Sequence, residues 1–313
     1  MDKKVRVAGI QNSRVLGDKD TNVPRGLEWV RRAADRGAQV IALPELSNTG
    51  FFPQHVDDSY FDLAEEIPGP TTERFANLAV QLGCYIIVPV FEVDAIHRVY
   101  YNSAALLGPA GVIGRYRKVH IPAWSRGVEK YYFAPGNLGY PVFELPFCRI
   151  GITICYDRHF PECYRHLALN GAQIVFSVNN TASQRSHHVW EAEMIATTSS
   201  NGIFLIQINA AGHEGESVFH GNSAIVSPRG EFIRRVEDGE HVLDAELDLH
   251  DLELARRQFS SVRDVVWRDF GLDGTQASHL LGDGSWGRPS VRNTHPRGDQ
   301  TGEAAAPTVS RIR

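Results

Sequence analysis

Three residues of types that act together in catalysis follow directly after stretches with the pattern of buried strands. Glu45 follows "VIALP", Lys118 follows "VIGRYR", and Cys155 closes "RIGITIC". Because ligands of open α/β sheets bind outside the carboxyl ends of the strands, we expect these side chains to converge on one crevice. A carboxylate, an ammonium and a thiol that meet in one crevice can carry out acyl transfer.

The chemistry that this set favours is nucleophilic attack by the thiol of Cys155. A thiol is a nucleophile only as its thiolate, so a neighbouring base must take its proton, and Glu45 can act as that base. Lys118 can stabilise the negative oxygen of a tetrahedral intermediate, together with the backbone N–H of Tyr156. These residue types therefore predict a reaction that passes through a thioester.

Each residue also has a purely structural interpretation. A free cysteine at the end of a buried strand often serves only as a small core residue, and Cys84, Cys148 and Cys163 keep that interpretation. Glu45 could be a solvated carboxylate in a strand-end turn, and Lys118 a surface residue of its strand. The combination of the three types, rather than any one of them, favours catalysis.

The elements that must position these residues are strands and helices in alternation, which predicts an α/β layered domain with a mixed sheet. A first helix stops at Gly37, and a second helix, capped by Thr71 or Thr72, stops at Gly83. The segment "YNSAALLGPAGVIGRYRK" predicts two antiparallel strands joined by a turn. Further strands are predicted over 4–11, 38–44, 84–92, 149–155, 173–178, 202–209, 222–228 and 231–236, and further helices from Pro161 and over 190–200.

Composition and charge narrow the class of protein. The chain has 313 residues, 42% hydrophobic content and a formal net charge of −5, which suits a folded core and a small-molecule substrate rather than nucleic acid. The start "MDKKVRVAGIQNS" lacks the apolar region of a signal peptide, and no window resembles a membrane span. We therefore expect a cytoplasmic protein with no membrane partner.

The sequence predicts one domain over residues 1–280. Residues 281–313 are rich in Gly, Pro, Ser and charge with few apolar anchors, which predicts a loose tail or an arm that contacts a neighbouring subunit. The cysteines lack CxxC spacing, His187 and His188 lack the i,i+4 spacing of a helical zinc site, and no HExxH occurs. We expect free thiols and no metal.

Three motifs resemble the signature regions of the nitrilase superfamily, the carbon-nitrogen hydrolases. They are "ALPELSNTG", "YRKVHIP" and "GITICYDRHFPE", and the resemblance runs from "VAGIQ" to "GEFIRRVEDGE". It implies an α-β-β-α sandwich that pairs into homodimers or larger homo-oligomers, with no metal and no organic cofactor. By position, Glu45 matches the general base, Lys118 the oxyanion stabiliser and Cys155 the nucleophile. Glu129 in "GVEKYYFAPGN" matches a second glutamate, which would orient the ammonium or the attacking water; otherwise it is a solvated loop carboxylate.

Within the superfamily, "GNLGYPVFE", "ICYDRHFPE" and "RDVVWRDF" look most like β-ureidopropionases and N-carbamoyl amino acid amidohydrolases. That resemblance implies that Arg158, three residues after Cys155, binds the substrate carboxylate, for which a guanidinium fork is well suited. Arg158 could instead form a salt bridge with Asp157 or Glu162. Asn180 in "SVNNT" is expected to line the pocket. An amidase or nitrilase acting on a simple amide or nitrile, and a catalytically inactive binding subunit, remain the alternatives.

Overall fold

The first of two sheets is built from the N-terminal half of the chain and one late strand. The computed structural model describes residues 4–123, 128–182, 187–259 and 261–265. The first sheet has the order β14-β1-β2-β3-β4-β5, in which β1, β2 and β3 are parallel and the other strands join antiparallel. Its strands are β1 (Lys4–Gln11), β2 (Val40–Ala42), β3 (Tyr85–Asp94), β4 (Val99–Gly108), β5 (Gly111–Arg117) and β14 (His241–Asp248).

The second sheet repeats this plan with the order β13-β12-β9-β8-β7-β6. Here β7, β8 and β9 are parallel, and the remaining strands join antiparallel. Its strands are β6 (Val142–Glu144), β7 (Arg149–Ile154), β8 (Ile174–Asn179), β9 (Phe204–Asn209), β12 (Ala224–Val226) and β13 (Phe232–Arg235); β10 (Ala211–Glu214) and β11 (Ser217–His220) form a separate hairpin.

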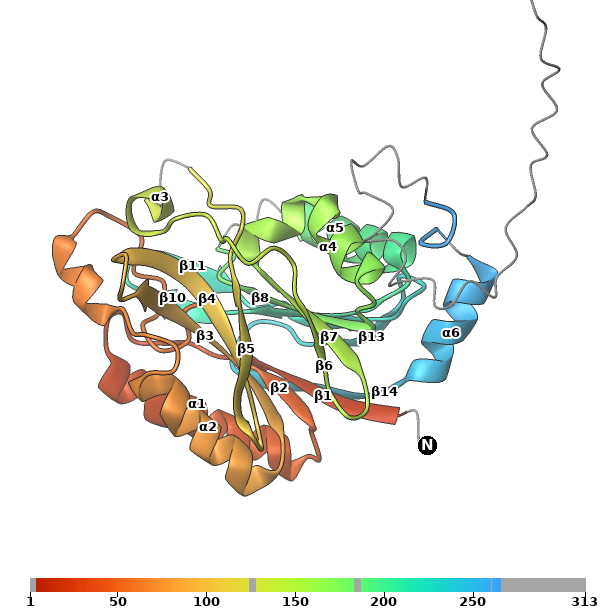
Figure 1. Cartoon of the computed structure of the whole chain (residues 1–313), viewed down its shortest axis with the longest axis horizontal. Coiled ribbons are helices and arrows are strands. Elements are labelled where there is room, and N and C mark those ends of the chain that lie inside the picture. The colour runs from red at the N-terminus through yellow and green to blue at the C-terminus, as the bar shows by residue number, and fades with distance from the viewer. Residues whose placement is uncertain (1–3, 124–127, 183–186, 260, 266–313) are drawn as a thin grey trace, which may run out of the picture. The chain divides into compact units, whose positions relative to one another are not determined.

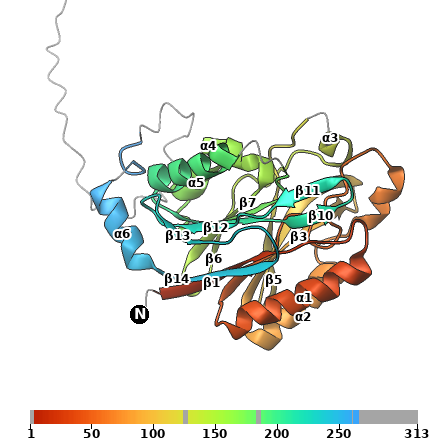
Figure 2. The same cartoon turned by 180° about the vertical axis from the view of Figure 1, so that it is seen from behind.

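The two sheets pack face to face, and helices cover their outer faces (Figure 1). One apolar core lies between them, with Val7 and Ile87 from the first sheet and Ile152 and Phe176 from the second. Helices α1 and α2 pack on the first sheet, and α4 and α5 on the second (Figure 2). The helices are α1 (Lys19–Asp35), α2 (Pro70–Leu82), α3 (Glu129–Tyr132), α4 (Pro161–Leu169), α5 (His187–Asn201) and α6 (Leu249–Gln258), with 3₁₀ turns η1 (Asp58–Leu63) and η2 (Cys155–His159). The predicted α-β-β-α sandwich is confirmed.

Helix α2 begins differently from the prediction. Its N-cap is Gly69, with Pro70 as the first helical residue, so the expected cap at Thr71 or Thr72 is wrong. Proline is favoured at the first helical position, because the N–H that it lacks would have no partner within the helix there. Thr72 lies in the first turn, where its hydroxyl accepts a hydrogen bond from the Gly69 N–H (2.9 Å). At the other end Gly83 adopts a left-handed conformation (φ 64°), as predicted.

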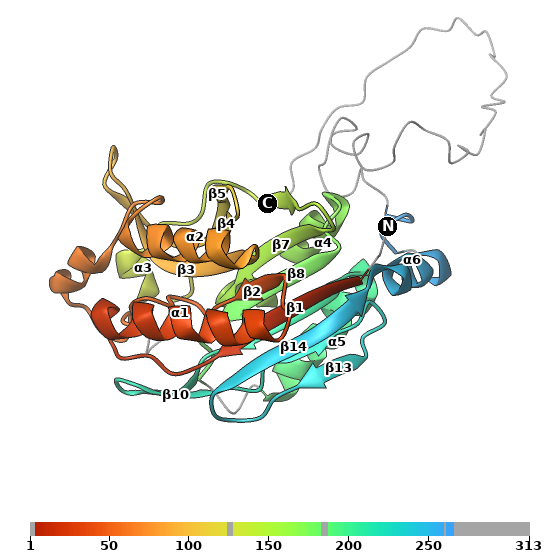
Figure 3. The ribbon, with the colours of Figure 1, turned by 90° about the horizontal axis from the view of Figure 1, so that it is seen from below.

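Several elements had no sequence prediction. Strand β14 pairs with β1 along residues 4–11, and α1 and α2 lie side by side on the outer face of the first sheet (Figure 3). Strand β6, the β10–β11 hairpin and helices α3 and α6 were also not predicted.

The proposed boundary at residue 280 and the tail over 281–313 lie outside the described residues, so both stay predictions. None of the helices in the described ranges combines the length and apolar content that crossing a bilayer requires.

Candidate active site

Two buried carboxylates hold the ammonium of one buried lysine. Lys118 directly follows β5, and its Nζ donates to Glu45 Oε1 at 2.9 Å and to Glu129 Oε2 at 2.6 Å. The three side chains are fully excluded from solvent. Asn102 on β4 also donates to Glu45 Oε1, at 2.8 Å. Sequence distances of 73 and 11 residues therefore close into one cluster at the end of the first sheet.

Each carboxylate keeps one oxygen unused. Within the described residues, Glu45 Oε2 and Glu129 Oε1 are buried and have no hydrogen-bond partner. A buried carboxylate oxygen without a donor is unusual, because leaving an acceptor unsatisfied is unfavourable. Such an atom can accept a proton or a hydrogen bond from a bound substrate or water.

The cluster sets the charge states of its members. Burial by itself would lower the pKa of Lys118, but the charges of Glu129 and Glu45 outweigh it and raise that pKa overall. Burial raises the pKa of Glu129, which Lys118 lowers in part and Glu45 raises further. Lys118 is therefore a permanent cation, and the pKa of Glu129 is raised to about 7.

Cys155 lies at the carboxyl end of β7, in the facing sheet. It begins η2 with a φ of 47°, a left-handed conformation that non-glycine residues rarely adopt and that often occurs at functional sites. Its side chain is 2% exposed. Burial, followed by the charge of Glu45, raises the pKa of its thiol to about 12, while Lys118 and Arg158 lower it. The thiol is thus protonated at neutral pH and lies in the electrostatic field of the cluster.

Asp157 fixes the turn that carries Cys155, a role that the sequence prediction missed. Its Oδ2 accepts from the Ile154 N–H (3.1 Å) and the Tyr116 hydroxyl (2.7 Å). Its Oδ1 accepts from the His120 N–H (3.0 Å) and contacts His120 Nδ1 (2.9 Å). A carboxylate with this many donors is held firmly, so Asp157 ties the η2 turn to β5 and to the segment after Lys118. The signal in the sequence was an acidic residue two positions after the thiol.

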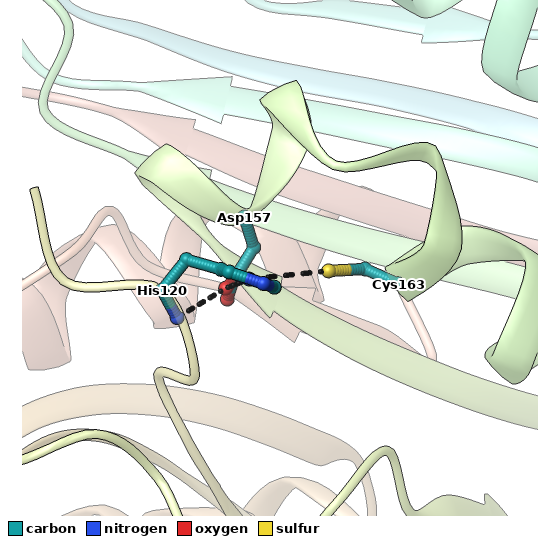
Figure 4. Close-up of side chains that lie close together, drawn as sticks. All are labelled: His120, Asp157 and Cys163. Carbon is teal, nitrogen blue, oxygen red and sulfur yellow. Dashed lines mark hydrogen bonds and ion pairs between the residues drawn. The ribbon is translucent and has the colours of Figure 1, made fainter. Parts of the chain in front are cut away.

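His120, Asp157 and Cys163 also form a compact group, shown in Figure 4. Their potential ligand atoms lie within 4.8 Å of one another, and Cys163 Sγ lies 3.5 Å from His120 Nδ1. The oxygens of Asp157 are already used by N–H and O–H donors, and burial raises the pKa of the Cys163 thiol to about 12. The group acts as a hydrogen-bonded support for the η2 turn; the prediction that no metal takes part stays a prediction. All four cysteines are free and buried, as expected.

Arg158 has a partner that the sequence did not indicate. Its Nε lies 3.0 Å from Glu193 Oε2 on α5, and its guanidinium lies 5.3 Å from the centre of the Trp190 ring. The suggested salt bridge to Asp157 or Glu162 is therefore wrong, because Glu193 supplies the carboxylate. Arg158 is 6% exposed. Its predicted contact with a substrate carboxylate stays a prediction, and the contact requires Arg158 to share its charge with Glu193.

Asn180, expected in the pocket wall, is used at both ends of its amide. Its Oδ1 accepts from Arg14 Nη2 at 2.6 Å, and its Nδ2 donates to the backbone carbonyl of Glu45 at 3.0 Å. Asn180 directly follows β8 of the second sheet, so it connects that sheet to the Glu45 loop. Its predicted role toward substrate remains a prediction.

A cavity of about 590 Å³ is lined in part by residues next in sequence to the cluster, and not by Glu45, Lys118, Glu129 or Cys155 themselves. Three residues of its wall, Val119, Lys130 and Tyr156, are direct chain neighbours of the catalytic candidates. Lys130 brings a positive charge into the wall, and none of the lining residues that the structure describes is a carboxylate. The cavity is lined by Val119, His120, Ile121, Ala123, Lys130, Phe133, Pro135, Tyr156 and Phe160.

Known proteins are similar to this chain in sequence and in fold. A family model described as carbon-nitrogen hydrolase matches residues 6–257. An N-carbamoylputrescine amidase from Solanum lycopersicum is 34% identical over 84% of this chain and 92% of its own. A nitrilase from Pyrococcus abyssi is 35% identical over 79% of this chain and 90% of its own. The crystal structure of a carbon-nitrogen hydrolase from Helicobacter pylori G27 has a TM-score of 0.80 at 27% identity, covering 86% of this chain and 99% of its own.

These matches agree with the site and the sandwich described above. The family match spans all the segments that carry the buried cluster and the thiol. The chain therefore belongs to the carbon-nitrogen hydrolases of the nitrilase superfamily and is an amidohydrolase, an enzyme that hydrolyses carbon-nitrogen bonds other than peptide bonds.

Proposed function

We propose that the protein is a cofactor-independent thiol amidohydrolase that cleaves the ureido group of an N-carbamoyl amino acid. The observation that carries the proposal is a buried lysine between two carboxylates that each keep an unused oxygen, with a buried thiol in their field. The thiol is neutral at rest, so it needs a base at the moment of attack. Glu45 is the base in this proposal.

The first half of the reaction forms a covalent intermediate. Glu45 takes the Cys155 proton as the sulfur bonds to the ureido carbon, and Lys118 with the Tyr156 N–H stabilises the resulting oxyanion. The bond from carbon to the terminal nitrogen then breaks, and the proton held by Glu45 passes to that nitrogen. Ammonia leaves, and an S-carbamoyl group remains on Cys155.

The second half returns the enzyme to its starting state. Glu45 takes a proton from a water molecule, whose oxygen attacks the S-carbamoyl carbon, and the unused oxygen of Glu129 helps to orient that water. The carbon-sulfur bond breaks, and the sulfur regains its proton. The product is a carbamate, which decays to carbon dioxide and the free amine.

Two observations bear on the other end of the substrate. The described cavity wall contains Lys130 and no carboxylate, which suits an acidic end better than a cationic one. Arg158 lies beside Cys155 in the chain, and it can bind a carboxylate if Glu193 shares it. The relative from Solanum lycopersicum is an N-carbamoylputrescine amidase, which supports the carbamoyl chemistry.

A second candidate keeps the same residues but takes a plain amide or a nitrile, in which case Arg158 is only structural. The similarity to the Pyrococcus abyssi nitrilase supports this alternative. Ammonia release from N-carbamoyl-β-alanine, N-carbamoyl-D-amino acids, N-carbamoylputrescine, short amides and nitriles decides between them. The highest kcat/KM on N-carbamoyl-β-alanine or an N-carbamoyl-D-amino acid is the expected result. A preference for N-carbamoylputrescine would reject the acidic-substrate assignment.

The catalytic roles are tested with Cys155→Ala and Glu45→Gln. We expect both to abolish turnover while the fold is retained, and mass spectrometry of Glu45→Gln with substrate to show intact substrate and no S-carbamoyl adduct, because this variant has no base to take the Cys155 proton. Full turnover by Cys155→Ala would overturn the mechanism. No ammonia release by the wild type from any member of the substrate panel would reject both candidate substrate classes. The cytoplasmic location and the homodimeric or larger assembly are retained as proposals.

A further inference from the structure

We propose that the buried ion pair of Arg14 and Glu214 is a positioning device for the general base Glu45. This inference rests on the proposed function, because it assigns a task to the surroundings of that base. Arg14 Nε lies 2.5 Å from Glu214 Oε1, and both side chains are almost completely excluded from solvent. Neither residue contributes an atom to the cluster of Lys118.

Arg14 connects the ion pair to the backbone of Glu45. Its Nη1 donates to the Glu45 carbonyl at 3.2 Å, and its Nη2 donates to Asn180 Oδ1 at 2.6 Å. Asn180 Nδ2 then donates to the same Glu45 carbonyl at 3.0 Å. Two donors thus bind one carbonyl oxygen, which uses both of its lone pairs and fixes the direction of this peptide unit.

Glu214 holds the continuation of the same loop. Its Oε2 accepts from the Phe51 N–H at 2.8 Å, while its Oε1 accepts from the Arg14 N–H at 3.2 Å. The loop needs left-handed residues to follow this path, Leu46 at φ 50° and Gly50 at φ 67°. A Cβ at position 50 would lie 3.1 Å from Glu214 Oε2, so backbone and carboxylate are packed closely here.

The connection crosses between the two sheets. Glu45 and Arg14 follow strands of the first sheet, β2 and β1, whereas Asn180 follows β8 of the second sheet. Cys155 follows β7, which pairs with β8 in that second sheet. The bonds among Arg14, Asn180 and the Glu45 carbonyl therefore set the position of the base relative to the sheet that carries the nucleophile. A buried ion pair contributes little net stability in general, so positioning is the task that explains it.

The test compares Arg14→Lys, Asn180→Ala and the double variant Arg14→Met with Glu214→Leu. Lysine keeps the charge but cannot donate in the guanidinium fork, and the double variant replaces the pair by apolar side chains of similar size. We expect each folded variant to lose about 10- to 100-fold in kcat with little change in KM, since small displacements of reacting groups have effects of this size. The exposed pair Arg32–Glu28 on α1, at 3.2 Å, supplies the controls Arg32→Lys and Glu28→Gln, which we expect to keep wild-type kcat.

The pH dependence of Cys155 alkylation by iodoacetamide separates positioning from mere stability. When Glu45 moves away, the thiol loses a negative neighbour and the charge of Lys118 is less compensated, so the alkylation profile shifts to lower pH. An unmoved profile with kcat loss equal to the loss of folded protein would overturn the inference, as would wild-type kcat in two folded variants. The turnover of Cys155→Ala is measured beside that of the other variants. Full turnover by Cys155→Ala would reject the proposed function itself. An inactive Cys155→Ala beside fully active Arg14 and Asn180 variants would reject only the positioning role.

Discussion

At the scale of single residues, the site places one permanent cation between two buried carboxylates. Lys118 is held between Glu45 and Glu129, and one oxygen of each carboxylate has no hydrogen-bond partner in the part of the chain that the structure describes. The ammonium is therefore already compensated in the resting enzyme. A negative charge that forms on a substrate oxygen would interact favourably with the same ammonium. Because this interaction exists only once the charge has formed, it stabilises the transition state more than the resting state.

Lys118→Met tests this compensation directly. The change leaves two carboxylates buried without a counterion, so we expect a loss of about 3–5 kcal/mol in the free energy of unfolding. The loss should be larger at pH 8 than at pH 5, because carboxylates must ionise for the repulsion to appear. Urea denaturation at both pH values measures it. Lys4→Met, which removes the exposed ion pair with Glu246, is the control and should change stability by less than about 0.5 kcal/mol.

The thiol of Cys155 predicts a distinctive alkylation profile. Burial and Glu45 raise its pKa to about 12, above the ordinary value of 9.0, and only the thiolate reacts with iodoacetamide. Without substrate, the alkylation rate of the wild type should rise about tenfold per pH unit through pH 9 and show no plateau by pH 10. Peptide mass spectrometry follows the site, and Cys155→Ser gives the background. A plateau at or below pH 9 contradicts the prediction.

At the scale of elements, the site depends on how β5 and η2 are joined. Asp157, two residues after Cys155, accepts hydrogen bonds from Ile154, Tyr116 and His120, which all precede Cys155 in the chain. The left-handed Cys155 is therefore held from both sides. The strain of a positive φ at a non-glycine residue persists only where its surroundings impose it. Asp157 supplies those surroundings and keeps the thiol at the end of β7.

Asp157→Asn should therefore loosen the turn without removing bulk. An amide offers one acceptor oxygen where the carboxylate offers two, so some of these donors lose their partner. We expect a loss of about 2–3 kcal/mol in the free energy of unfolding and a lower kcat in the protein that remains folded. Thermal unfolding and initial rates measure the two effects. Glu162→Gln, an equivalent change at an exposed position of α4, should alter neither.

At the scale of the whole sandwich, the two sheets come into close contact at a glycine of the first sheet. A Cβ at Gly9 of β1 would lie 2.5 Å from Ile208 Cγ1 of β9, inside any allowed contact. Strand β1 also lies inside its sheet, between β14 and β2. A side chain at position 9 would therefore collide with Ile208 across the core.

Gly9→Ala should destabilise the sandwich by about 1–3 kcal/mol through overpacking. Ile208→Ala alone should also destabilise it, because it leaves a cavity in the core. In the double variant the new methyl group fills part of that cavity, so the combined loss should be smaller than the sum. A double-mutant cycle from urea denaturation measures the coupling. Strict additivity would show that the two residues do not compete for the same space.

Features that depend on local pattern could be predicted from the amino-acid sequence. Apolar runs of strand length, the turn between β4 and β5, and the glycine at the end of α2 predicted most of the elements, because strand and helix periodicity and turn chemistry act over a few residues. The residue types at three strand ends also predicted that Glu45 and Lys118 would meet. Strand β14 was not predicted, because its outer position leaves it a mixed polar and apolar pattern.

Which groups are partners became clear only from the folded chain. The pairing of Arg158 with Glu193, of Arg14 with Glu214, and the donors around Asp157 join segments far apart in the sequence. No periodicity reports such contacts, since a charged residue has the same local signature whether its partner is three or two hundred positions away. Burial then raises the pKa of the Cys155 thiol and of Glu129, because the free energy of a charge depends on everything packed around it.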